Sequence, residues 1–220
     1  MIQEKPLEGI QTDARSHPAG ARGAKISLQE TADRAWKARM SPRLRAWTTQ
    51  VIDKAGAAKG GRRQKVTAIL DAARNQTFYV ADPLMGEFIA TPDQILCLDK
   101  EKGLCIKGID CDEYSVLLAA AYMSIGIPAM IIGSSHKEPA DVPTHVFCAF
   151  QDELDNWVRT DGTTNHPVGQ TAQHLREWWL EPGKDAKEKG VGDFVGMSEK
   201  DVGVSGSPMS APGLRYPGIR

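Results

Sequence analysis

The sequence has no apolar run close to the roughly 20 residues that a membrane-spanning helix needs. Its first residues also lack the basic-then-apolar order of a secretory signal peptide. These two absences predict a soluble, cytoplasmic chain without a membrane partner. No internal repeat is visible either, which argues against a solenoid.

Cysteine is scarce, with four residues in a chain of 220. None lies in a Cys-x-x-Cys pair, and four are too few for a disulfide scaffold, so we expect reduced thiols. Ligand spacing typical of structural zinc is missing as well, which disfavours a metal site. The residues weighed for such a site are Cys97, Cys105, His136, His166 and His174.

Charge is unevenly distributed although the net charge is only −1. Residues 1–65 carry 14 Lys and Arg against 6 Asp and Glu, whereas the rest carries 13 against 22. A basic front of this kind can dock on an acidic surface of its own domain or of a neighbour, contact nucleic acid, or form a solvated helical face. No nucleic-acid-binding motif accompanies it, so nucleic acid is the least favoured partner.

Glycine and proline concentrate at the two ends of the chain. Residues 1–26 are predicted to form an extended arm, and residues 183–220 a tail rich in Gly, Ser and Pro, because neither has enough large apolar groups to build a core. Residues 27–75 are predicted to be a helical region. Its expected helices span 27–40, begun by a capping box from Ser27 to Glu30, then 42–55 and 62–75.

The predicted catalytic core, residues 76–182, combines one buried helix with a sheet. Residues 111–125 are apolar or small on every side, and Gly126 followed by Pro128 ends the helix. Three β-like runs follow, at 129–132, 145–150 and 157–160. The order predicts an α+β fold in which the helical front packs on an antiparallel sheet.

Three residues in this core have the chemistry of a catalytic triad. Cys111 begins the buried helix, where the helix dipole favours a thiolate and backbone N–H groups can stabilise an oxyanion. His145 opens one strand and Asp161 closes the next, so a hairpin brings them to the same end of the sheet. Asp161 can then orient the imidazole of His145 toward the thiol.

These motifs resemble the transglutaminase-like superfamily, which has a papain-like fold. The resemblance implies that Cys111 is the nucleophile, His145 the base and Asp161 the orienter, in acyl transfer on amides through a thioester. It also implies a protein or peptide substrate and no cofactor. The residues that carry it are 110–120, 126–129, 144–146 and 157–163, with Tyr79, 82–83 and 91–92 upstream.

A second hypothesis is a structural or assembly component that retains this fold, for example a protein of a phage virion. Extended termini suit docking into a larger assembly, and some members of the superfamily resemble genes of tailed phages, which would make the virion the location. Members usually have Gly two residues before the nucleophile, whereas this chain has Ile109 there and Gly108 one position earlier. The departure favours the structural role, and the intact Cys, His and Asp favour the enzyme.

Overall fold

The computed structural model describes residues 21–82, 89–98, 105–136 and 142–184, and these residues form an α+β fold, which confirms the predicted class. The helices are α1 (Ala21–Ala38), α2 (Pro42–Lys54), α3 (Arg62–Gln76), α4 (Pro92–Ile95) and α5 (Cys111–Ser124). The strands are β1 (Phe78–Tyr79), β2 (Gly108–Ile109), β3 (Ala129–Ser135), β4 (His145–Gln151), β5 (Trp157–Thr160) and β6 (Arg176–Leu180). Among the described residues, no helix has the length and apolar character needed to cross a membrane.

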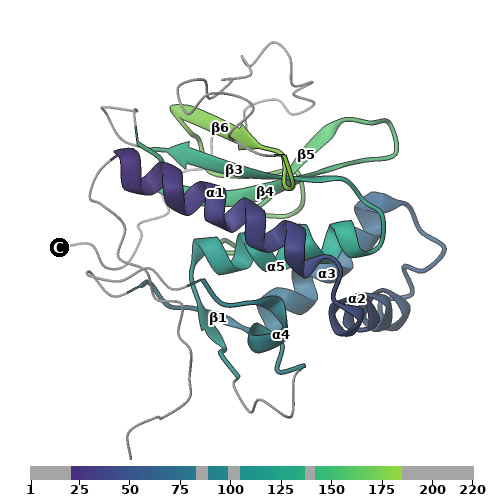
Figure 1. Ribbon diagram of the computed structural model, residues 1–220. Helices are drawn as coiled ribbons and strands as arrows, with labels where there is room; N and C mark the ends of the chain where they lie inside the picture. The colour runs from purple at the N-terminus through teal and green to yellow at the C-terminus, as the bar shows by residue number, and fades with distance from the viewer. Residues whose placement is uncertain (1–20, 83–88, 99–104, 137–141, 185–220) are drawn as a thin grey trace, which may run out of the picture.

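Helix α5 lies at the centre of the molecule. The four-stranded sheet, in the antiparallel order β5-β4-β3-β6, packs on one side of it, and α2, α3 and α4 pack on another (Figure 1). Helix α1 contacts both α5 and β3. The prediction that the helical front packs on the sheet is therefore right for α1, whereas α2 and α3 pack mainly on α5.

Small side chains allow α5 to be surrounded in this way. The run of Ala119, Ala120 and Ala121 is completely buried, and Leu117 and Tyr122 fill the space around it. A helix that is apolar on every side is typical of a domain interior. The core thus places the first residue of α5, Cys111, at a fixed position relative to strand β4.

Helix α1 begins at Ala21, so the prediction of an extended arm is wrong for residues 21–26. Ser27 does not cap the helix. Its hydroxyl is buried and donates to Asp112 Oδ2 at 3.1 Å, and the adjacent Leu28 is buried against the sheet. The rest of the predicted arm, and the predicted tail from residue 185, lie outside the described residues.

Two strand pairings were not predicted from the sequence. The stretch before Leu180 forms β6, which adds to β3 with Ile131 opposite Leu180. Phe78 and Tyr79 pair in parallel with Gly108 and Ile109 as β1 and β2.

The prediction that all cysteines are reduced is wrong, because Cys97 and Cys105 form a disulfide. The bond closes the connection between α4 and β2, and it removes both thiols as ligands for the zinc site considered above. Cys111 and Cys148 are free, and Cys148 is completely buried.

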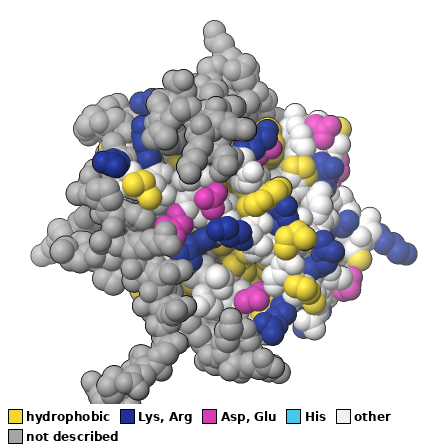
Figure 2. Space-filling view, viewed as in Figure 1, with side chains coloured by type: hydrophobic (Ala, Val, Ile, Leu, Met, Phe, Trp, Pro, Cys, Tyr) yellow, Lys and Arg dark blue, Asp and Glu magenta, His cyan; other side chains and the backbone are white. Residues whose placement is uncertain are grey.

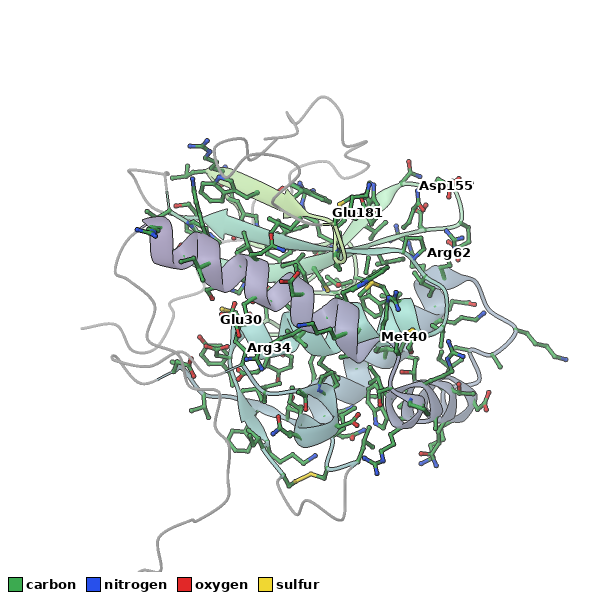
Figure 3. The ribbon with its side chains drawn as sticks, in the orientation of Figure 1. Glu30, Arg34, Met40, Arg62, Asp155 and Glu181 are labelled. Atoms are coloured by element: carbon green, nitrogen blue, oxygen red, sulfur yellow. A yellow bond between two sulfur atoms is a disulfide. The ribbon has the colours of Figure 1, made fainter. Side chains whose placement is uncertain are left out.

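The basic front docks in part on acidic residues of its own domain, as one alternative predicted. Arg62 at the start of α3 lies 3.7 Å from Asp155 at the tip of the β4–β5 hairpin, and both are labelled in Figure 3. The backbone N–H of Arg63 donates to Glu153 Oε1 at 3.1 Å. The hairpin tip therefore supplies a carboxylate to the N-terminus of α3, whose own N-cap, Gly61, has no side chain.

On the face shown in Figure 2, basic, acidic and hydrophobic side chains are interspersed over the described residues. Within that face, Arg34 of α1 pairs with Glu30 one turn earlier at 2.7 Å (Figure 3). The positive charges of α1 are in this way partly balanced within the helix itself.

The contact between α1 and β3 predicts the effect of a methyl group at Gly133. A Cβ there would lie 2.8 Å from Leu28 Cδ2 and 3.2 Å from Pro143 Cβ. We expect Gly133→Ala to lower the free energy of unfolding by about 1–3 kcal/mol, because over-packing forces α1 away from the sheet. Urea denaturation measures this. Gly60→Ala is the matched control, since only the flexible end of Gln64 must move, and a loss there as large as that of Gly133→Ala would contradict the explanation.

Candidate active site

The N-terminus of α5 is capped by two carboxyl groups that hold Cys111 in place. Asp110 is the N-cap, and its side chain accepts hydrogen bonds from the backbone N–H groups of Asp112, at 2.9 Å, and Glu113. Glu113 accepts in return from the N–H of Asp110 at 2.9 Å and from the N–H of Ala90 at 3.1 Å. This capping box ties the segment before α4 to the residue that precedes Cys111.

Glu113 holds a proton that an ordinary glutamate would lose. Burial, the hydrogen bond to the Asp110 side chain and the charge of Asp110 raise the pKa of Glu113 from 4.5 to about 8. Asp110 and Glu113 therefore share one proton near neutral pH. The sequence contains the signal for this arrangement, an Asp followed three residues later by a Glu at the start of an apolar helix, although the capping box was predicted only at Ser27.

His145 and Asp161 come together as the sequence predicted. Strands β4 and β5 form a hairpin with Cys148 opposite Thr160. The Nε2 of His145 lies 2.9 Å from Asp161 Oδ2, and both side chains are largely buried. Since Asp161 occupies Nε2, the other ring nitrogen, Nδ1, is the one that can serve as a base.

Asp161 is kept ionised by its hydrogen bonds. Burial alone would raise the pKa of this carboxyl, but the hydrogen bond and charge of His145, together with two hydrogen bonds from Thr163, hold the pKa below its usual value. The Thr163 N–H and hydroxyl donate to Oδ1 at 2.9 and 2.7 Å. Arg74 of α3 donates to the backbone carbonyl of Asp161 at 2.7 Å, which fixes the end of β5.

Gly162 brings Asp161 close to helix α5. A Cβ at this position would overlap the ring of Tyr114, which is one turn along α5 from Asp110. The hydroxyl of Tyr114 accepts a hydrogen bond from Thr77 at 2.7 Å. The side chain of Tyr114 therefore packs against the residue that follows Asp161, and any larger residue there would push the end of β5 away from α5.

The sulfur of Cys111 lies at the start of β4, where the backbone N–H of Val146 is directed at it. Val146 follows His145, so the thiol lies against the strand that carries the imidazole. Burial, followed by the charges of Asp112 and Asp110, raises the pKa of the Cys111 thiol well above 9, although the N–H of Val146 acts in the opposite direction. Burial and the two carboxylates therefore oppose the helix dipole and favour the protonated thiol over the thiolate expected from the sequence.

One backbone donor at the helix start stays available. The N–H groups of Asp112 and Glu113 are bound by the Asp110 side chain, and that of Tyr114 by the Asp110 carbonyl at 3.1 Å. The N–H of Cys111 has no acceptor among the described residues. It is the group in the capped turn that can donate to an oxyanion formed on a carbonyl attacked by the sulfur.

Two more histidines surround His145. The ring of His136 lies 5.8 Å from that of His145 and 4.6 Å from that of His174, and His174 stacks on Phe147. Burial, then the nearby charges of His136, His145 and Arg159, lower the pKa of His174 to about 3. The ring of His174 is therefore neutral near pH 7, and it lies beside His136 and Phe147. No group of three His, Cys, Asp or Glu in the described part of the chain is arranged to hold a metal ion.

No protein-family model matches the sequence, and no curated protein matches it. Among solved structures, a proposed cysteine protease from Cytophaga hutchinsonii is 18% identical over 70% of this chain and 48% of its own, with a TM-score of 0.41. A proposed protease from Parabacteroides distasonis is 13% identical over 71% and 35%, with a TM-score of 0.44. A TGase is 19% identical over 66% and 36%, with a TM-score of 0.36. The chain spans less than half the length of each, and the function proposed below rests on the geometry of the site.

The shared proton predicts how stability depends on pH. The fold raises the pKa of Glu113 from 4.5 to about 8, so its contribution is fully present below pH 4.5 and is lost as the pH rises toward 8. The free energy of unfolding then falls by up to about 1.4 kcal/mol per pH unit. Glu113→Gln cannot ionise at this position. We therefore expect this dependence of the free energy of unfolding on pH to vanish in the variant, as measured by urea denaturation from pH 5 to 8. Glu181→Gln, which alters a carboxylate paired with Lys184 on the surface, is the control, and an unchanged slope in Glu113→Gln would refute the shared proton.

The carboxylates beside the thiol predict a charge effect on its reactivity. We expect Asp112→Asn to lower the pKa of Cys111, because it removes the largest contribution to the upward shift after burial. The pH profile of alkylation by iodoacetamide should move to lower pH. Asp93→Asn, which changes a distant carboxylate near Arg43, should leave the profile in place. A profile that moves equally in both variants would point to a general charge effect.

Proposed function

We propose that this chain is a cysteine-dependent acyltransferase acting on amide bonds, with Cys111 as nucleophile, His145 as general base and acid, and Asp161 as orienter. The observation that carries the proposal is the 2.9 Å contact between His145 Nε2 and Asp161 Oδ2 at the end of the sheet where Val146 lies against the Cys111 sulfur. A Cys–His pair oriented by a third group is the arrangement that nucleophilic catalysis requires.

In the first half of the reaction, the sulfur attacks the carbonyl carbon of the amide while its proton moves to His145 Nδ1. Because the resting thiol is protonated, this proton transfer accompanies the attack. The N–H of Cys111 donates to the oxyanion, and the imidazolium, stabilised by Asp161, then protonates the departing amine. A thioester on Cys111 and a free amine result.

In the second half, His145 removes a proton from the acceptor, which is water or an amine. The acceptor attacks the thioester, and Cys111 leaves and regains its proton from His145. The products are a carboxylic acid or a new amide, so the same residues support peptide-bond hydrolysis and transamidation.

A structural or assembly role is the second candidate. It is favoured by the raised pKa of Cys111, which leaves the isolated site in its unreactive form, and by Ile109 in place of a glycine. Turnover distinguishes the two candidate functions, because an enzyme converts a substrate whereas an assembly component only binds a partner.

Substitution of the three residues tests the enzyme directly. We expect Cys111→Ala to abolish turnover of p-nitrophenyl acetate and of dimethylcasein, and His145→Gln to lower kcat by about 10²–10⁴-fold, since the base is lost. Asp161→Asn should lower kcat with little change in KM. The matched control is Cys148→Ala, which removes the other free thiol, buried in β4. If the wild-type protein turns over neither substrate in a way that depends on Cys111, the result would favour the structural role.

A further inference from the structure

Two histidines that the proposed reaction does not use are fixed beside the strand end that carries His145. The carbonyl of Ser135, the last residue of β3, accepts a hydrogen bond at 2.8 Å from the N–H of Leu175. His136 directly follows Ser135, and His174 directly precedes Leu175. This backbone hydrogen bond therefore holds the two histidine rings next to each other, with their centroids 4.6 Å apart.

Four aromatic rings form a cluster at this end of the sheet. Phe147 lies two residues after His145 on the same face of β4, and the two rings are stacked with their centroids 6.0 Å apart. His174 stacks on Phe147 at 4.9 Å, and His136 lies 5.8 Å from His145. Aromatic side chains attract one another at centroid distances of roughly 4.5–7 Å. His145 therefore contacts Phe147 and His136, and His174 contacts both of these.

His174 acts in the cluster as a neutral ring and not as a polar group. Both of its ring nitrogens are buried, and neither has a hydrogen-bond partner among the described residues. Burial and the charges of His136, His145 and Arg159 lower its pKa to about 3, against the opposite effect of Asp161. Since the ring stays uncharged near pH 7, it adds no positive charge beside the imidazolium that His145 forms in the reaction.

We propose that His174 is a positioning residue for His145: through Phe147 and His136, its flat ring holds the imidazole in the orientation in which Nε2 donates to Asp161 and Nδ1 is the base. The inference rests on the function proposed above. The outer torsion of a histidine side chain has broad minima, so a hydrogen bond at one nitrogen leaves the tilt of the ring loosely defined. Stacking on a supported ring restricts this tilt. Misplacement of a catalytic group by about 1 Å can lower the rate by roughly 10²-fold.

Replacement of the ring tests this role through ester turnover by the full chain. We expect His174→Ala to lower kcat for p-nitrophenyl acetate at least tenfold and to change KM less than threefold, because a tilted base slows proton transfer without affecting substrate binding. His174→Phe keeps a flat, neutral ring and should retain kcat within threefold. His166→Ala is the matched control and should leave kcat unchanged. Its Nδ1 is also buried without a partner, and its contact with Arg74 is made by the backbone carbonyl, which the substitution keeps.

Proton NMR gives a readout that does not depend on turnover. The Nε2 proton that His145 donates to the Asp161 carboxylate resonates downfield of the backbone amides, and His145→Gln assigns the signal by removing it. We expect His174→Ala to speed exchange of this proton with water at least tenfold, and His174→Phe to leave the exchange rate within threefold of the wild type. If thermal unfolding shows that His174→Ala disturbs the fold, His174→Leu decides, because leucine fills the volume without a flat ring. Positioning by the ring predicts that the leucine variant loses kcat and proton protection, whereas packing alone predicts wild-type behaviour.

The outcomes separate this role from the proposed function. Unchanged kcat and proton exchange in His174→Ala and His174→Leu, with ester turnover that still depends on Cys111, would refute the positioning role and leave the enzyme intact. A loss in His174→Phe or in His166→Ala as large as that in His174→Ala would also overturn it. If the wild type shows no turnover that depends on Cys111, the proposed function fails, and proton exchange still decides whether His174 supports the contact of His145 with Asp161.

Discussion

The capped start of helix α5 is the constraint on which the site depends. The first N–H groups of a helix have no partner within it, and where the helix begins inside the protein they need acceptors. Asp110 accepts from two of them, and Glu113 reaches back to the N–H of Asp110 and across to Ala90. The geometry leaves the N–H of Cys111 for a ligand. A structural requirement of the helix thereby fixes both the position of Cys111 and the donor beside its sulfur.

Asp161 places the same kind of constraint on the other side of the site. A buried carboxylate requires donors, and His145 and Thr163 provide them. Because Nε2 of His145 is occupied by this carboxylate, the tautomer that leaves Nδ1 as the base is the one the environment stabilises. Arg74 links the Asp161 backbone to α3, and Gly162 lets Tyr114 of α5 pack against the next residue. The two halves of the site are thus held together by packing as well as by polar contacts.

The sequence predicted the parts of this arrangement that depend on local pattern. Helix α5 was found because its residues are apolar and because Gly126 and Pro128 follow it, and the β4–β5 hairpin because two β-like runs flank an acidic turn. Strand β6 and the β1–β2 pairing join segments that are far apart in the sequence, and the Cys97–Cys105 disulfide depends on a distance that sequence spacing does not reveal. The predicted helix cap at Ser27 was wrong for a related reason, since a hydroxyl that could cap a helix can also donate to a distant carboxylate, here Asp112. The contact of His145 with Asp161 could be predicted, but the sign of the pKa shift of Cys111 could not, because burial and neighbouring carboxylates are tertiary features.

The electrostatics of the site constrain how it can work. A helix N-terminus stabilises an adjacent anion by about 0.3–1 kcal/mol at an exposed site and by up to about 2 kcal/mol where the site is partly buried. Burial and the carboxylates of Asp112 and Asp110 act against it and keep the thiol of Cys111 protonated in the free protein. A cysteine enzyme with this resting state is protected from adventitious alkylation and oxidation, which attack the thiolate. Under the proposed function, its reactivity then has to come from proton transfer to His145 at the moment of attack.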